Sequence, residues 1–228
     1  MHELPRLILV ILCLALMIAW IAWVSRQVRE PSGWLGSRMV RAMNLTHATM
    51  TDWGLQQLTV PKNAAILDVG CGGGRTVHTL ASLAPEGTVV GLDYSPVCVA
   101  TSRDSNAAEI KAGRVQIEQG SVAALPFPDR TFDIVTAVET HYYWPDLPAN
   151  VREILRVLKP GGTFALIAET YRGGPFRLVY GAVMPLLRAS FLSDGEHRDL
   201  LTQAGFTEVT TRHVAGKNWI VATGLRPS

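Results

Sequence analysis

The sequence predicts an α/β fold in which apolar strands alternate with helices. Two observations support this prediction: a glycine-rich turn follows the apolar residues 64–69 and opens a helical segment, and further strand-like segments recur along the chain. An acidic residue, Asp93, ends the second of these segments. The predicted strands are residues 64–69, 88–93, 115–119, 132–138, 163–169, 208–214 and 219–225.

The turn after the first strand is typical of a loop that binds a nucleoside cofactor. Gly70, Gly72, Gly73 and Gly74 allow the backbone to turn tightly and to approach a ligand without clashes at Cβ. The helix that follows directs its first N–H groups at the ligand. A dinucleotide-binding loop needs a small residue five positions after Gly70, but Arg75 stands there. A nicotinamide-dependent oxidoreductase is therefore disfavoured.

Residues 68–74 spell Asp-x-Gly-x-Gly-x-Gly, which resembles the S-adenosylmethionine-binding motif of class I methyltransferases. Residues 125–133 and 158–162 are similar to segments of the small-molecule methyltransferases of ubiquinone and menaquinone biosynthesis. The resemblance covers residues 61–225 and implies S-adenosyl-L-methionine as the cofactor. It also implies a Rossmann-like, seven-stranded, mostly parallel sheet with helices on both faces and the last strand antiparallel.

The expected cofactor residues lie at the carboxyl ends of the strands, where ligands bind in open α/β sheets. By the resemblance, Asp68 helps to place the methionine end, and Asp93 is expected to accept hydrogen bonds from both ribose hydroxyls. Tyr94 either lies near the adenine or serves only in packing. Ser121 stands where family members often carry an aspartate, so the charge-assisted bond to the adenine amino group is missing. The predicted set is Asp68, Gly70, Cys71, Gly72, Gly74, Asp93, Tyr94, Ser121, Val122 and Glu139.

Residues 138–144 follow the fourth strand and form the candidate catalytic segment. Methyl transfer is an in-line displacement in which positioning contributes much of the catalysis, and a base is needed only if the acceptor loses a proton. His141 is the candidate base, and Tyr142 is expected to flank the sulfonium or an aromatic acceptor. His141 could instead lie in a solvated loop or cap a helix. Glu139 is expected to bind the ammonium of the cofactor or to cap a helix.

An uncharged apolar segment near the start of the chain predicts a transmembrane helix. It runs from Leu7 to Val24, and as a helix it would span roughly 27 Å, close to the thickness of a hydrocarbon core. A cleaved signal peptide and a buried core helix are the alternatives. Arg6 stands alone before the segment, so the excess of arginines after it predicts a catalytic domain that faces the cytoplasm. These arginines are Arg26, Arg29, Arg38 and Arg41.

The chain divides into an anchor, a linking segment and one domain. Residues 1–28 form the predicted single-pass anchor, residues 29–60 the linking or cap helices, and residues 61–228 the methyltransferase domain. Within the domain, residues 171–192 are either a lid insertion or a segment that packs on the sheet or touches the membrane surface.

The linking segment is expected to form two short amphipathic helices. In related enzymes the segment before the first strand folds over the cofactor as a lid. By that resemblance, His47 and Trp53 would line the pocket, whereas the alternative for His47 is a purely structural role.

The charge balance and the cysteine spacing give no sign of a nucleic-acid partner, a disulfide framework or a metal site. The formal net charge is +2, from 21 basic and 19 acidic residues, and no long basic run indicates a nucleic-acid partner. The 3 cysteines have neither disulfide nor metal-ligand spacing, so no metal site is predicted. The leading hypothesis is methyl transfer to a small, lipophilic acceptor at a membrane. The alternative is a membrane-tethered protein that binds S-adenosylmethionine without catalysis; the oligomeric state is left open.

Overall fold

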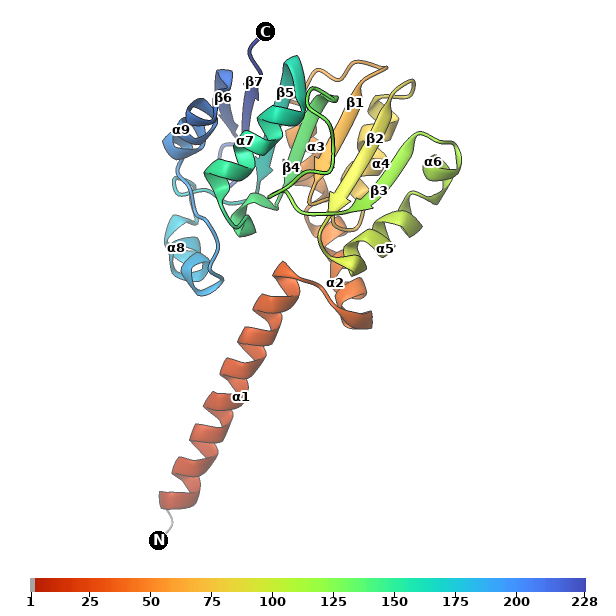
Figure 1. The fold of residues 1–228 in the computed structure, drawn as a ribbon. Coiled ribbons are helices and arrows are strands. Elements are labelled where there is room, and N and C mark those ends of the chain that lie inside the picture. Colours follow the sequence, from red (N-terminus) through yellow and green to blue (C-terminus); the bar gives the residue numbers. More distant parts are fainter. Residues whose placement is uncertain (1–2) are drawn as a thin grey trace.

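The computed structural model describes residues 3–228, without the side chains of residues 3–11, 14, 18, 21 and 28. Its described strands form one seven-stranded sheet at the centre of the domain (Figure 1). The strands are β1 (Ala65–Val69), β2 (Thr88–Asp93), β3 (Val115–Gln119), β4 (Phe132–Val138), β5 (Leu158–Ala168), β6 (Thr207–His213) and β7 (Ile220–Leu225).

The order of the strands is β3-β2-β1-β4-β5-β7-β6. The first five strands run parallel, and β7 lies antiparallel between β5 and β6. Parallel neighbours need crossover connections, which the intervening helices supply. The predicted Rossmann-like sheet with an antiparallel last strand is thus confirmed.

Helices cover both faces of the sheet. Helices α3, α4 and α5 pack over one face, and α7 and α9 pack over the other. The helices are α1 (Glu3–Arg29), α2 (Gly33–Thr46), α3 (Ala48–Leu55), α4 (Arg75–Leu83), α5 (Pro96–Ser105), α6 (Ala107–Lys111), the 3-10 turn η1 (His141–Tyr143), α7 (Leu147–Val157), α8 (Arg177–Leu186) and α9 (Asp194–Ala204).

The core consists of two apolar layers, one on each face of the sheet. Because side chains alternate along a strand, Ile66 of β1 joins Leu80 of α4 on one face, and Leu67 joins Ile154 of α7 on the other. All four side chains are fully buried. This double burial explains why the parallel strands read as nearly continuous apolar runs.

Strand β5 begins earlier than the sequence predicts. The predicted strand starts at residue 163, whereas Leu158 already pairs with Phe132 of β4. Farther along, Gly161 donates to the carbonyl oxygen of Arg226 at 2.9 Å, and Arg226 donates to Gly162 at 2.8 Å. These bonds draw the Pro-Gly-Gly turn into the edge of the sheet, so α7 ends directly where β5 begins.

Helix α1 has 27 residues and extends away from the end of the domain where α2 and α8 lie (Figure 1). Among the described residues, no helix is long and apolar enough to cross a membrane. The predicted span of residues 7–24 lies partly outside the described side chains. The last turn of α1 contacts the domain, since the Tyr94 hydroxyl donates to the carbonyl oxygen of Arg29.

Candidate functional site

A cavity of about 1330 Å³ opens at the carboxyl ends of the parallel strands. Its wall is formed by the glycine turn, the residues after β2, β4 and β5, helix α2, helix α8 and the last turn of α1. Open α/β sheets bind ligands at this edge. The volume exceeds the roughly 300–1,000 Å³ of a usual small-molecule site, so a cofactor and an acceptor both have room.

The glycine turn forms one wall of the cavity, and its backbone requires glycine. Gly70 and Gly72 adopt φ values of +74° and +51°, which other residues rarely take. A Cβ at Gly70 would collide with Thr140, whereas a Cβ at Gly72 would meet no atom within 4 Å. Gly72 thus presents bare backbone to the cavity, which suits the close approach of a cofactor.

The Asp93 carboxylate is held rigidly beside this turn. One oxygen accepts from the backbone N–H of Gly72 and the other from that of Ser95, both at 2.9 Å. Asp93 is only 7% exposed, and its burial raises the pKa of the carboxyl above the usual range. It lines the cavity at the end of β2, where the predicted ribose contact requires it. The predicted residues Cys71, Tyr94, Ser121 and Val122 line the same cavity.

Two predicted cofactor residues lie behind the wall rather than on it. Asp68 is 1% exposed and accepts a 2.6 Å hydrogen bond from the Thr136 hydroxyl. Burial raises its pKa to about 7. Gly74 forms the left-handed N-cap of α4 and packs against Ser102 and Asn106 of α5. Both residues therefore support the glycine turn from beneath.

The segment after β4 divides its side chains between the cavity and the core. His141 is fully buried, and neither ring nitrogen has a hydrogen-bond partner among the described residues. Its ring centroid lies 5.5 Å from that of His197, away from the cavity wall. Burial holds the pKa of His141 well below its usual range. The structure thus does not bring the candidate base His141 to the cavity.

Tyr142 and Glu139 of this segment do line the cavity. The Tyr142 hydroxyl donates to Oε1 of Glu139 at 3.0 Å, and the backbone N–H of Thr170 donates to the same hydroxyl at 3.2 Å. Glu139 adopts φ = +57°, which is uncommon for a residue with a side chain. Burial raises the pKa of its carboxyl to about 7.

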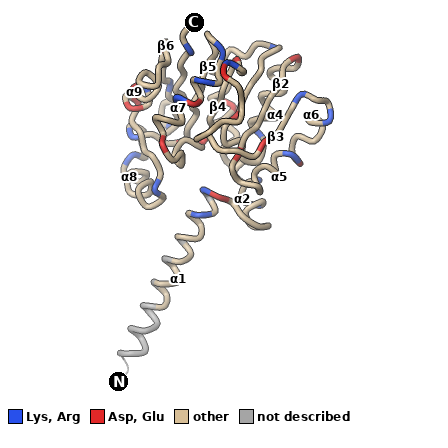
Figure 2. The backbone as a smooth tube through the Cα atoms, in the orientation of Figure 1, with Lys and Arg blue, Asp and Glu red and all other residues tan. Residues whose placement is uncertain are grey.

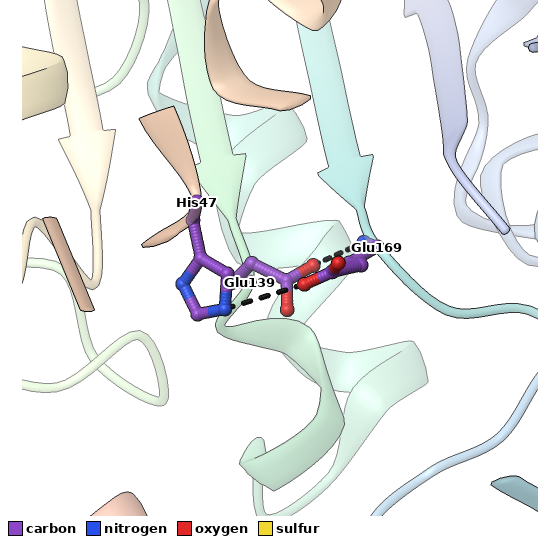
Figure 3. A group of neighbouring side chains, drawn as sticks. All are labelled: His47, Glu139 and Glu169. Carbon is purple, nitrogen blue, oxygen red and sulfur yellow. Dashed lines mark hydrogen bonds and ion pairs between the residues drawn. The ribbon is translucent and has the colours of Figure 1, made fainter. Parts of the chain in front are cut away.

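Glu139 meets two side chains from distant segments, His47 and Glu169 (Figure 3). His47 lies at the junction of α2 and α3, and Glu169 directly follows β5. Nε2 of His47 lies 3.3 Å from Oε2 of Glu169. His47 lines the cavity, as the predicted lid requires. Trp53, which was also expected to line the pocket, packs against Trp219 outside the cavity.

The linking helices are fastened to the glycine turn and the helix that follows it. Arg75, the first residue of α4, forms a 2.8 Å ion pair with Asp52 of α3. A Cβ at Gly73 would collide with Asn44 of α2. Arg75, whose size argues against a dinucleotide-binding loop, thus fastens α3 to the start of α4.

Glu169 and the α8 side chains Tyr180 and Met184 also line the cavity, although none of them was predicted to belong to the site. Glu169 ends a predicted strand, and the rule that ligands bind at strand ends could have identified it. The α8 residues carry no comparable signal, because their position depends on how the insertion folds back over the sheet.

Comparison with known proteins agrees with this arrangement. Residues 67–166 match the family model of a methyltransferase domain. The demethylmenaquinone methyltransferase of Lactiplantibacillus plantarum is 30% identical over 176 residues, which are 75% of this chain and 72% of that protein. The demethylmenaquinone methyltransferase of Shouchella clausii is 29% identical over 196 residues, which are 76% and 83% of the respective chains.

A solved structure shares the fold. It is a chain of the complex between the Haloferax volcanii Trm112 methyltransferase activator and a methyltransferase. The TM-score is 0.76 at 21% identity, and the match covers 86% of this chain and 96% of that one. At this identity the likeness concerns the fold alone.

Proposed function

This chain belongs to the class I S-adenosylmethionine-dependent methyltransferases, and we propose that it methylates a small, lipophilic acceptor at a membrane. The observation that carries the proposal is the cavity, which joins the glycine turn to the apolar helices α1 and α8. Family membership makes the chain an enzyme and replaces the alternative of a cofactor-binding protein without catalysis.

S-adenosylmethionine supplies a methyl group on a positively charged sulfur. On this proposal, Asp93 holds the ribose, Gly70 and Gly72 admit the methionine end, and Ser121 and Val122 lie at the adenine end. Asp68 acts indirectly by supporting the turn. Positioning in a cavity covered by α2 supplies the main catalytic effect.

The acceptor is proposed to lie between the glycine turn and α8. Tyr180, Met184 and Leu187 of this region give the cavity an apolar wall. Two relatives are named demethylmenaquinone methyltransferases, which supports a quinone-like acceptor for this chain too.

Membrane attachment is proposed to occur through α1. Its described apolar side chains are exposed, as at Leu16 (70%) and Trp20 (64%), which is costly in water for a contiguous surface. Trp23 and the basic residues Arg26 and Arg29 follow at the domain end of the helix, as anchors at a membrane interface do. The excess of arginines on this side supports a catalytic domain that faces the cytoplasm.

Helix α8 offers a second apolar surface at the same end of the domain. Leu178, Val179 and Leu186 are 80%, 61% and 76% exposed. Arg177 begins this helix and Arg188 follows its end, and Figure 2 shows basic residues at α8. Apolar side chains flanked by arginines favour contact with an anionic lipid surface.

The proposal is tested with membranes from cells that lack the chain. Purified full-length protein and S-adenosylmethionine labelled in its methyl group are added, and the lipid extract is analysed by mass spectrometry. We expect an acceptor whose mass rises by one methyl group, with release of S-adenosylhomocysteine. Methylation confined to water-soluble molecules would refute the lipophilic acceptor. A reporter fused after Ser228 that is exported would refute the cytoplasmic orientation.

A further inference from the structure

Three side chains on the cavity wall converge from separate parts of the chain (Figure 3). His47, Glu139 and Glu169 each offer one ligand atom, and these atoms all lie within 4.8 Å of one another. We infer that they bind a divalent transition-metal ion. Nothing in the spacing of these residues along the sequence indicates this site, because only the fold brings them together.

The donor set determines the kind of ion. One imidazole nitrogen and two carboxylate oxygens suit manganese, iron, cobalt or zinc better than calcium, which takes oxygen alone. An ion bound about 2.0–2.2 Å from each donor requires the donors to lie about 3–4.3 Å apart. Small side-chain rotations from the observed arrangement therefore suffice to complete the site.

A bound cation would also balance the charge of the two carboxylates. Among the described residues, neither Glu139 nor Glu169 forms an ion pair with lysine or arginine, and the only basic partner is the imidazole of His47. Arg26, Arg29, Arg75 and Arg188 line the same cavity, and of these Arg75 is paired with Asp52. Two carboxylates side by side in a partly buried wall are unfavourable without a compensating positive charge.

Neighbouring groups hold the carboxylates in place. The backbone N–H of Glu169 and the Tyr142 hydroxyl both donate to Oε1 of Glu139, so the other oxygen can serve as a ligand. Such outer partners orient the ligands of metal sites. Beside Glu169, Thr170 is buried on the same cavity wall, and its hydroxyl has no hydrogen-bond partner among the described residues. The Thr170 hydroxyl is therefore free to form a hydrogen bond with a small molecule that is bound to the ion.

The role of the ion rests on the proposed methyl transfer. Three protein donors leave coordination positions open, and an acceptor oxygen bound there would be polarised within the same cavity as the cofactor. This role favours an acceptor that bears a hydroxyl or keto oxygen. Binding of the ion can be measured without cofactor or acceptor, so the two proposals can fail separately.

The test is a titration of the metal-stripped, full-length protein in detergent with Mn²⁺, followed by the electron paramagnetic resonance signal of the free ion. We expect one Mn²⁺ per chain. His47→Gln and Glu169→Gln should each weaken binding by about tenfold or more. The matched control is His78→Gln, because His78 forms a 3.0 Å pair with Glu109 outside the cavity.

Absence of binding, or equal affinity in the wild type and in the His47→Gln and Glu169→Gln variants, would overturn the inference. A further titration contains saturating S-adenosylmethionine, whose ammonium is the competing cation for Glu139. Retention of Mn²⁺ supports the metal site. Displacement of Mn²⁺ would assign the carboxylates to the cofactor and overturn it.

Discussion

Asp93 holds the glycine turn, and we propose that the same buried carboxylate binds the ligand. Replacement by asparagine removes the charge that strengthens hydrogen bonds to ribose hydroxyls, which is worth about 1.5–3 kcal/mol. We expect Asp93→Asn to weaken S-adenosylmethionine binding by roughly 10- to 100-fold, as measured by calorimetry. Asp104→Asn, an exposed site on α5 that does not line the cavity, is the control. Unchanged affinity in Asp93→Asn would remove this residue from the site.

Asp68 makes stability depend on pH. Its pKa is 3.8 when unfolded and about 7 in the fold, mainly because of burial, and the nearby Asp93 carboxylate raises it further. The Cys71 thiol also lies close and is neutral, since burial raises its pKa. Between these two values the folded state binds more protons than the unfolded state. The free energy of unfolding therefore falls as pH rises from about 4 to 7.

Asp68→Asn removes this titration and can still accept the bond from Thr136. We expect the variant to melt at a higher temperature than the wild type at pH 8 and to show a flatter profile between pH 5 and 8. Thermal unfolding without ligand measures this effect. A wild-type slope in the variant would mean that other groups cause the pH dependence.

At this scale the sequence predicted many of the residues near the glycine turn that line the cavity and few of the others. The rule that ligands bind at strand ends places Asp93 correctly on the cavity wall. It could not tell that His141 turns into the core while Tyr142 faces the cavity, because the direction depends on the single 3-10 turn of η1. Nor could it bring His47 to Glu169, since that contact depends on the packing of α2 over the sheet.

At the scale of elements, local signals determined most boundaries. Ser193 and Glu196 form a capping box at the start of α9, and Gly205 ends the helix with φ = +105°. Strand β5 begins earlier than predicted because Leu158 and Gly161 find backbone partners in β4 and near the end of the chain. Partners that lie far away in the sequence cannot be predicted from local sequence.

The capping box gives a prediction for α9. Ser193→Ala removes the side-chain oxygen that accepts from the N–H of Glu196, and we expect a loss of about 1 kcal/mol of stability. Ser82→Ala is the control, because that exposed hydroxyl only bonds back to His78 within α4. Chemical denaturation compares the two. Equal losses would show that the cap contributes nothing specific.

For the whole molecule, the alternation of strands and helices predicted an α/β fold, and the resemblance predicted the mostly parallel sheet and its antiparallel last strand. The sequence left open whether residues 171–192 form a lid or pack on the sheet, since nothing local indicates over which edge an insertion folds. Helices α1 and α8 lie at the same end of the domain (Figure 1). This common placement is what gives the molecule one apolar end.

Two substitutions test whether the apolar end of the molecule contacts lipid, one on α8 and one away from it. Leu178→Glu places a charge on α8, and we expect turnover of an acceptor embedded in vesicles to fall roughly fivefold, for about 1 kcal/mol of lost apolar contact. Leu83→Glu changes an exposed site at the end of α4 that does not line the cavity, and it should retain full turnover. Both variants should bind S-adenosylmethionine normally. Equal turnover in the two would exclude α8 from the lipid contact.

The last turn of α1 has a practical consequence for handling the protein. Arg29 accepts from Tyr94, and the carbonyl oxygen of Pro31 accepts from Ser95 at 3.2 Å, so residues just after the apolar stretch complete the rim beside Asp93. Cutting away the first thirty residues to gain solubility would leave that rim unfinished. Weak cofactor binding by such a shortened chain would then result from the missing part of the cavity rim. It would not measure the affinity of the native enzyme.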